Sequence, residues 1–321
     1  MSPVQVEMDG RIALRITVVF SGALGDTLLL HPMTEWLRSV FPGCRVTLVT
    51  TDSIGKLFVS LGWVEAAVDI NLHNHHRWFG ADTAATTPPW ALCDWLISGV
   101  SNGHDHWAAA GQRRSTARRI SYFDPRPHAQ SNDHVVVQWC RQIGVPMTRS
   151  PSSVLATSPW KWQPVGRVVV LHPGSGGREK CWSLNHFKAV AQRLGNRNFQ
   201  PRFILGPVEC ERMDKSELAN LCREFQTITT DNLAELTVAL SSAVAFCGND
   251  SGVSHLAAML GVPTVSIFIR SNPRWWCPVG RVVRVMASRQ VLMPAAAVMM
   301  LPPEGNCLPG GSYGPDAASP D

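Results

Sequence analysis

"RVVVLHPGSGGREKCWSLNHFKAVAQRL" occupies residues 167–194 and changes character twice along its length. Its first part, RVVVLHP (167–173), is a short apolar run typical of a buried β-strand. The glycine-rich loop GSGGREK (174–180) follows, and residues 183–194 then carry apolar side chains at helical spacing. A strand, a glycine-rich loop and a helix in this order often hold a phosphate group, because exposed loop amides and the helix N-terminus attract anions.

Strands and helices alternate on both sides of this stretch. Toward the C-terminus, the sequence predicts strands at 202–206, 244–248 and 263–268, and helices at 210–225, 232–243 and 251–261. Toward the N-terminus, it predicts strands at 14–20, 45–50 and 65–70, and helices at 27–40 and 53–62, with a kink at Pro32. This βαβ alternation indicates an α/β protein with parallel, doubly wound sheets.

Three segments lack a clear period. Residues 71–134 predict loops and short helices, and a helix is expected after them at 133–145. Residues 146–166 are rich in proline and serine, which indicates a linker. Residues 301–321 are rich in proline, glycine and small polar residues, and they predict a disordered tail.

The length of the chain favours two domains, because 321 residues exceed one ordinary hydrophobic core. We predict an N-terminal Rossmann-like domain over 11–150, a linker over 151–165 and a C-terminal Rossmann-like domain over 166–300. Open α/β sheets bind ligands at the carboxyl ends of their strands. The turns that follow the predicted strands are therefore the candidate sites.

Composition narrows the class of protein. The net charge is +5, and no Lys/Arg run is long enough for a nucleic-acid arm. The densest basic patch, RRSTARR (113–119), is either a solvated loop or a contact for an acidic substrate or an anionic lipid surface. The nine cysteines form no CxxC pair, which favours reduced thiols in the cytoplasm. We expect no signal peptide, and no stretch reaches the roughly 18 apolar residues of a membrane span.

Three glycine-bearing turns lie between a predicted strand and a predicted helix: GALGD (22–26), PGSGGREK (173–180) and GNDSG (248–252). None matches G-x-x-x-x-G-K-[ST] or G-x-G-x-x-G, so the two best-known nucleotide fingerprints are absent. A dehydrogenase-like dinucleotide binder is weakened by this absence. The physical basis for phosphate binding, exposed amides beside a helix N-terminus, remains in all three turns.

The turn PGSGGREK offers several donors to an anion. Ser175 can donate a hydroxyl hydrogen bond, the glycines Gly174, Gly176 and Gly177 can expose amides, and Lys180 can neutralise phosphate charge. The spacing fits equally well a plain turn with a solvent-exposed lysine.

The turn GNDSG offers a helix cap or an anion site. Asp250 or Ser251 is a good N-cap for the helix that follows. Ser251 and Gly252 could instead present amides to a diphosphate. His255 lies four residues after Ser251 on the same helix face, where it either packs in the core or contacts a ligand.

Asp26 in GALGD has two interpretations as well. It is a natural N-cap for the helix expected from residue 27, or a carboxylate that removes a proton from an incoming hydroxyl group. The histidines of HNHH (73–76) and HDH (104–106) fit the spacing of no common metal site, so we predict no metal.

Four motifs in fixed order resemble glycosyltransferase family 9, the ADP-heptose:lipopolysaccharide heptosyltransferase family. They are GALGDTLLLHP (22–32), the opening stretch, ILGPVE (204–209) and FCGNDSGVSHLAAMLGVPTVSIF (246–268). The resemblance covers 11–50 and 165–285. It implies a GT-B fold, in which two Rossmann-like domains face each other across a cleft, with the acceptor in the N-terminal domain and the donor in the C-terminal one.

The resemblance also implies roles for single residues. Asp26 matches the general base, Lys180 a contact to the donor's phosphates, and Glu209 an acidic residue that holds the ribose hydroxyls. The turn that holds the diphosphate and sugar is matched by Asp250, Ser251 and Gly252, with His255 following. Members of the family act without a metal and invert the anomeric centre.

From this resemblance we expect an inverting glycosyltransferase with a nucleotide-sugar donor, most simply ADP-heptose, and no further cofactor. The expected acceptor is a lipopolysaccharide core or another lipid-linked saccharide. The expected location is the cytoplasm, with peripheral contact at the inner membrane face, as a monomer and without nucleic acid. Two alternatives stay open: another nucleotide sugar, or a donor-binding member without turnover. Many members read F-G-P-T-x-P where this chain has FIRSNP (268–273).

Overall fold

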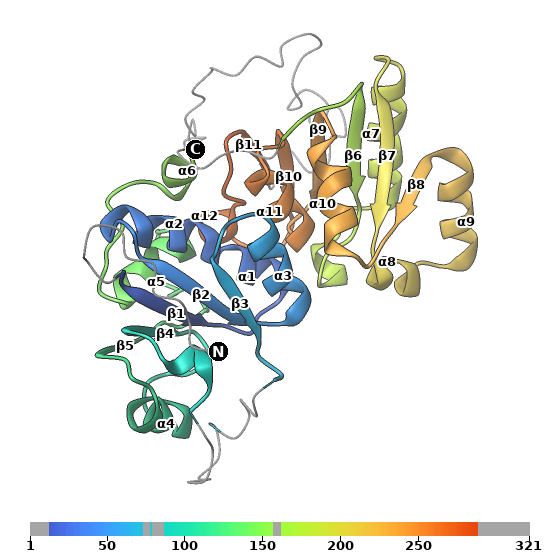
Figure 1. Ribbon diagram of the computed structural model, residues 1–321. Helices are drawn as coiled ribbons and strands as arrows, with labels where there is room; N and C mark the ends of the chain where they lie inside the picture. Colours follow the sequence, from blue (N-terminus) through green and yellow to red (C-terminus); the bar gives the residue numbers. More distant parts are fainter. Residues whose placement is uncertain (1–12, 73–77, 79–86, 157–161, 288–321) are drawn as a thin grey trace. The chain divides into compact units, whose positions relative to one another are not determined.

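Two parallel β-sheets carry the helices of this protein, one in each half of the chain (Figure 1). The computed structural model describes residues 13–72, 78, 87–156 and 162–287. The chain divides into two units, residues 1–158 and 159–321. The α/β class predicted from the sequence is confirmed in both units.

The N-terminal unit contains a five-stranded sheet in the order β3-β2-β1-β4-β5, with every pair of neighbours parallel. Its strands are β1 (Arg15–Val19), β2 (Arg45–Thr50), β3 (Ala66–Asp69), β4 (Trp95–Ser98) and β5 (Arg119–Tyr122). Its helical segments are α1 (Leu24–Leu28), α2 (Leu30–Val40), α3 (Asp52–Ser60), η2 (Pro89–Ala91), α4 (His106–Arg114), α5 (Val135–Gln142) and α6 (Pro151–Leu155).

The C-terminal unit contains a six-stranded sheet in the order β11-β10-β9-β6-β7-β8, again parallel throughout. Its strands are β6 (Val168–His172), β7 (Gln200–Leu205), β8 (Gln226–Thr229), β9 (Ala245–Asn249), β10 (Thr264–Phe268) and β11 (Val283–Ala287). Its helical segments are η3 (Arg178–Lys180), α7 (Leu184–Gly195), α8 (Pro207–Arg212), α9 (Lys215–Glu224), α10 (Leu233–Ser241), α11 (Gly252–Met259) and α12 (Pro273–Trp276).

The central strands are buried along their whole length. Every residue of β6, β9 and β10 is buried, as expected for strands covered on both faces of a parallel sheet. The core of this unit joins side chains of these strands to the apolar faces of α7 and α9, and it includes Phe187, Phe203 and Leu221. This packing fixes the strand ends, and therefore the turns that follow them.

The helix predicted over 27–40 is two helices. The chain breaks at Leu29, so α1 ends at Leu28 and α2 begins at Leu30. Pro32 therefore lies in the first turn of α2, where its missing N–H would have no intrahelical acceptor. The helix predicted over 210–225 is also two, α8 and α9, because Asp214 caps a new helix by accepting from the Ser216 amide at 2.8 Å.

The prediction of loops and short helices over 71–134 is confirmed by η2 and α4 but is wrong in part, because the strands β4 and β5 lie there as well. Strand β4 is buried at all four positions and β5 is half-buried at three of four, so neither shows the alternation of a half-buried strand. The side chain of Arg119 in β5 is exposed, yet its guanidinium lies 3.8 Å from the centre of the Trp95 ring of β4. The strands β8 and β11 were missed as well.

The segment predicted as a linker begins with a helix. Ser150 accepts a hydrogen bond from the Ser153 amide, and Pro151 takes the first helical position, where proline is favoured. The resulting helix α6 packs against α2 of the N-terminal unit. In the described ranges, no helix has the length and apolar character needed to cross a membrane.

His31, in the first turn of α2, is buried and stacks on Trp63 with the ring centroids 4.1 Å apart. Burial, together with a smaller contribution from the charge of Arg38, lowers the pKa of the imidazole from 6.5 to about 3. The folded chain therefore keeps His31 neutral at pH 7.

Replacing His31 by phenylalanine is expected to make the unfolding free energy depend less on pH below pH 7. Below its usual pKa the unfolded chain binds a proton here that the folded chain does not, so the unfolding free energy falls as the pH drops from 6.5 toward 3. Between pH 7 and pH 5 the wild type should lose about 2 kcal/mol more than His31→Phe. Urea unfolding at both pH values measures this difference, and parallel profiles would refute it.

Candidate functional site

The candidate site lies where three neighbouring strands of the C-terminal sheet end. Strands β9, β6 and β7 are adjacent and parallel, so their carboxyl ends meet at one edge. The loop 173–183 follows β6, Gly206 follows β7, and Asp250 follows β9. The fold therefore brings together two of the three glycine-bearing turns, PGSGGREK (173–180) and GNDSG (248–252).

Lys180 and Asp250 form an ion pair between these turns. The Lys180 Nζ lies 3.3 Å from the Asp250 Oδ2. The carboxylate is largely buried, with 9% of its side chain exposed, whereas 39% of the Lys180 side chain is exposed. The ammonium group of Lys180 is therefore partly exposed at the site while it is paired with Asp250 of the turn GNDSG.

Asn249, the last residue of β9, holds both ends of the loop. Its Nδ2 donates to the carbonyl oxygens of Pro173 at 2.7 Å and Gly174 at 3.3 Å, and its Oδ1 accepts from the Trp182 amide at 2.9 Å. The side chain is fully buried. Sequence reasoning missed this role, although an amide at the end of an apolar strand was a usable signal.

The Ser175 hydroxyl joins the same two turns. It donates to the Asp250 carbonyl oxygen at 2.6 Å, and the side chain is buried. The prediction that this hydroxyl is available to an anion is therefore corrected, because its proton is used inside the protein. The backbone amide of Ser175 and those of the glycines remain the candidate donors of this loop.

Ser251 is the N-cap of α11, and Asp250 is not. The Ser251 Oγ accepts from the Ser254 amide at 3.4 Å, and the Ser254 hydroxyl donates to the Asn249 carbonyl oxygen. Gly252 is the first residue of α11. His255 lies in the first turn, where its amide donates to the Ser251 carbonyl oxygen at 3.2 Å and its side chain is buried.

Glu209 approaches the loop from α8. Its Oε2 accepts from the Gly206 amide at 2.8 Å, which is the carboxylate half of a capping box, since Gly206 has no side chain to complete the other half. A Cβ on Gly174 would lie 1.9 Å from the Glu209 Oε1. The close approach of this carboxylate therefore requires glycine at position 174.

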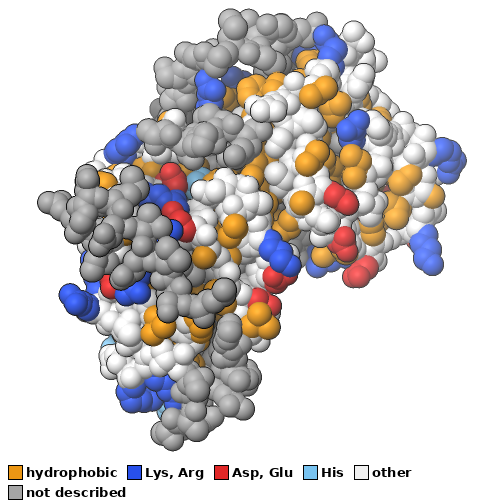
Figure 2. Space-filling view, viewed as in Figure 1, with side chains coloured by type: hydrophobic (Ala, Val, Ile, Leu, Met, Phe, Trp, Pro, Cys, Tyr) orange, Lys and Arg blue, Asp and Glu red, His pale blue; other side chains and the backbone are white. Residues whose placement is uncertain are grey.

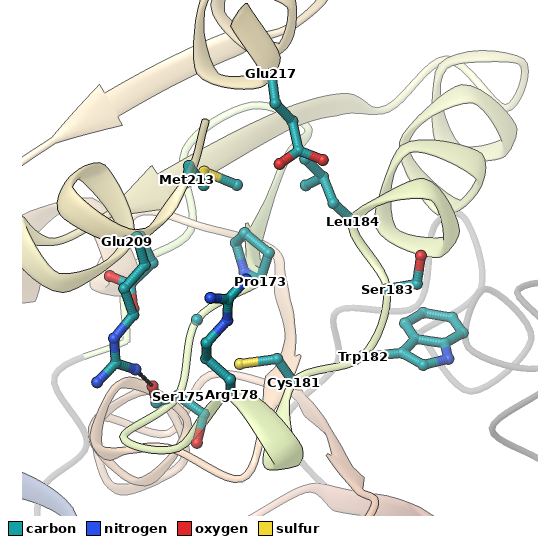
Figure 3. Close-up of a pocket in the computed structure, with 12 residues that line it drawn as sticks. Pro173, Ser175, Arg178, Cys181, Trp182, Ser183, Leu184, Glu209, Met213 and Glu217 are labelled. Carbon is teal, nitrogen blue, oxygen red and sulfur yellow. Dashed lines mark hydrogen bonds between the residues drawn. The ribbon is translucent and has the colours of Figure 1, made fainter. Parts of the chain in front are cut away.

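A pocket of about 280 Å³ opens between this loop and the helices α8 and α9 (Figure 3). Its lining combines apolar side chains with charged ones from three elements. The lining residues are Pro173, Gly174, Ser175, Arg178, Cys181, Trp182, Ser183, Leu184, Glu209, Arg212, Met213 and Glu217. Of the predicted site residues, Gly174, Ser175 and Glu209 line this pocket.

The imidazole of His172, at the end of β6, lies under the loop. Its Nδ1 is 3.0 Å from the Ile204 carbonyl oxygen, and the ring is buried. Burial lowers the pKa of His172, and the nearby Glu209 carboxylate opposes that shift. Because the ring is neutral, His172 links β6 to β7 beneath the loop without adding a charge to the site.

Asp26 lies in the N-terminal unit, in the first turn of α1. The N-cap of α1 is Ala23, which makes no side-chain cap, so of the two interpretations of Asp26 the helix cap is wrong. Its position still follows the end of β1, the middle strand of its sheet. Asp26 is half-buried.

The histidine motifs give no metal site in the described ranges. No group of three or more His, Cys, Asp and Glu side chains there is arranged to hold an ion. Residues 73–76 lie outside the described residues. In the second motif, Asp105 caps α4 by accepting from the Ala108 amide at 2.9 Å.

The glycines of the loop allow a matched test of its packing. In Gly174→Ala the new methyl group should displace the Glu209 carboxylate and break its bond to the Gly206 amide, which costs about 1–2 kcal/mol of unfolding free energy. Gly176→Ala is the control, because a Cβ there meets no atom within 4 Å. Urea unfolding compares the two, and equal stabilities would contradict the clash.

Comparison with known proteins gives the family of this chain. Residues 105–297, more than half of the chain, match glycosyltransferase family 9 (heptosyltransferase). Lipopolysaccharide heptosyltransferase 3 of Escherichia coli (strain K12) is 31% identical over 114 residues, which are 34% of this chain and 33% of that protein. In these matches the chain spans about a third of the length of the curated relatives.

Solved structures give the fold. E. coli heptosyltransferase WaaC with ADP has a TM-score of 0.63 at 18% identity, over 87% of this chain and 94% of that one. E. coli ADP-heptose lps heptosyltransferase II has a TM-score of 0.62 at 14% identity, over 90% and 97%. These likenesses confirm the expected GT-B class with two Rossmann-like units. On the family match and the shared fold, this chain belongs to glycosyltransferase family 9.

Proposed function

We propose that this protein is an inverting, metal-independent glycosyltransferase that moves a heptose from ADP-heptose to a lipopolysaccharide core or another lipid-linked saccharide. The observation that carries the proposal is the junction of the loop 173–183 with Asp250 at the ends of β6 and β9. A lysine, loop amides and the start of α11 meet there, which suits a diphosphate.

The leaving group explains why these residues are useful. In the proposed reaction an acceptor hydroxyl oxygen attacks the anomeric carbon while the bond from that carbon to the diphosphate oxygen breaks, and the nucleoside diphosphate leaves with the bonding electrons. Lys180 and the amides of the loop would stabilise the negative charge that develops on it. In the proposed mechanism no metal is required, because Lys180 and the loop amides would compensate the charge of the leaving group.

Asp26 would take the proton of the attacking hydroxyl group. It follows the end of the central strand of the N-terminal sheet, in the first turn of α1, where a substrate of that unit would bind. Attack from the face opposite the diphosphate inverts the anomeric carbon. Glu209 would accept ribose hydroxyls, since a carboxylate that already binds the Gly206 amide has further lone pairs to offer.

The acceptor side of the proposal rests on the basic residues 113–119. Arg113 and Arg118 are exposed, whereas Arg119 donates to the Ile143 carbonyl oxygen at 2.5 Å and stacks on Trp95. On the face that Figure 2 shows, Lys and Arg side chains lie in small groups. We propose peripheral contact with an anionic lipid surface in the cytoplasm, by a monomeric enzyme.

Calorimetric titration with ADP, UDP, GDP and CMP, each in the presence of EDTA, tests the donor. We expect ADP to bind most tightly and the chelator to have no effect. A preference for UDP or GDP would keep the reaction class and replace ADP-heptose as the donor. Binding without release of ADP from ADP-heptose, in the presence of lipopolysaccharide core acceptors, would favour a member of the family without turnover.

A further inference from the structure

We infer that Arg212 is a positioning residue, which holds the carbonyl groups of the loop 173–180 so that the amides of Gly176 and Gly177 face the bound diphosphate. The identity of the ligand, a diphosphate, rests on the proposed function. The geometry rests on the hydrogen bonds described below.

The guanidinium of Arg212 reaches from the last turn of α8 to the tip of the loop. Its Nη1 donates to the carbonyl oxygens of Ser175 and Gly176 at 3.3 Å each, and its Nη2 donates to that of Gly176, also at 3.3 Å. The dashed line that reaches Ser175 in Figure 3 marks one of these hydrogen bonds. Two successive carbonyl groups are thus turned toward α8.

The planarity of the peptide bond links these carbonyls to the amides that follow. In a trans peptide the C=O of one residue and the N–H of the next point in opposite directions. Holding the carbonyls of Ser175 and Gly176 toward Arg212 therefore turns the N–H groups of Gly176 and Gly177 away from it. Within the part of the chain that the structure describes, neither amide donates to a protein acceptor.

Successive amides that point to the same side form a concave site for an anion. The base of this loop is held by Asn249 and by the Ser175 hydroxyl. Its tip, where the two amides lie, is held by Arg212. Without the guanidinium the tip could rotate, and part of the binding free energy would then be spent on ordering it.

The fork of the guanidinium is essential to this role. Two nitrogens in one plane can address neighbouring carbonyls at once, whereas a lysine ammonium is a point charge on a flexible stem. Arg212→Lys therefore keeps the charge and removes the geometry. Arg212→Gln removes both. Arg212 is exposed, so neither change opens a hole in the core.

Two measurements on the full-length protein test the inference. The first is the affinity for ADP, which we expect to fall roughly 10-fold in both Arg212→Lys and Arg212→Gln. The second is hydrogen exchange without nucleotide, which should become faster at the amides of Lys180 and Cys181, since these donate to carbonyls of the same loop. Arg223→Gln is the control, because Arg223 is an exposed arginine of α9 that bonds locally to Asn220 at 2.7 Å.

The outcomes separate the inference from the proposed function. If Arg212→Lys binds ADP like the wild type while Arg212→Gln does not, Arg212 acts through its charge and the positioning role is overturned. If the wild type binds no nucleoside diphosphate, the proposed function fails. The exchange measurement then decides alone: faster exchange in Arg212→Lys supports positioning of the loop, and an unchanged rate overturns it.

Discussion

Asp26→Asn is expected to lower the turnover number by about 10²- to 10⁴-fold, the usual contribution of a general base. Asparagine has the shape of aspartate, so the first turn of α1 should be preserved. Its amide cannot accept the proton of an attacking hydroxyl group. The affinity for ADP should stay at the wild-type value, because the residues that we assign to the donor lie in the other unit.

Asp52→Asn is the matched control for this prediction. Asp52 also lies in the first turn of a helix, α3, which follows the neighbouring parallel strand β2. It is exposed and pairs with Lys56 at 2.6 Å on the same helix. Its replacement should leave turnover close to the wild-type value. Steady-state release of ADP measures both variants, and equal rates for Asp26→Asn and the wild type would remove the proposed base.

The longer buried strands were predicted from their runs of apolar residues, although β4, which is buried at all four positions, was missed. Strands β6, β9 and β10 are buried at all five positions, and their β-branched and aromatic residues reveal them. The strand β8 has four residues, none of them fully buried, and was missed. At such edges of a sheet the structure depends on pairing with a neighbour, which a single sequence does not display.

The site was predicted in pieces for a related reason. Each glycine-bearing turn is a local feature, so the positions of Lys180 and Asp250 could be found one at a time. Asn249 and Arg212 act through partners that lie 75 and 37 residues away, at Gly174 and Ser175. Their roles depend on the order of the strands in the sheet, which brings these distant partners together. The residue types alone do not show that order. The interpretation of Asp26 as a helix cap failed for a simpler reason. The helix α1 begins at Leu24, three residues before the start that the apolar pattern suggests, so Asp26 lies inside the helix.

Lys180→Ala should weaken ADP binding by about 10- to 100-fold, the range for losing a hydrogen bond to a charged group. Two effects add in this variant. The positive charge that faces the phosphates is lost, and the Asp250 carboxylate, which lies 3.3 Å from the lysine in the wild type, loses its partner and repels the ligand. Calorimetric titration with ADP in EDTA measures the loss.

Lys188→Ala is the control for the loss of a lysine ion pair in the same unit. Lys188 of α7 pairs with Glu224 of α9 at 3.1 Å, and it belongs to neither of the two turns. Its replacement should leave the affinity for ADP unchanged. An equal loss in Lys188→Ala and Lys180→Ala would mean that net charge, and not the position of Lys180, determines binding.

The double variant Lys180→Ala/Asp250→Asn divides the two effects. If repulsion by the unpaired carboxylate contributes, removing its charge should restore part of the affinity that Lys180→Ala loses. If instead Asp250 itself binds the donor, as the family resemblance implies, the double variant should bind more weakly than Lys180→Ala alone. The sign of the coupling therefore assigns Asp250 either to the support of Lys180 or to direct contact with the donor, and each outcome leaves Lys180 as the cation of the site.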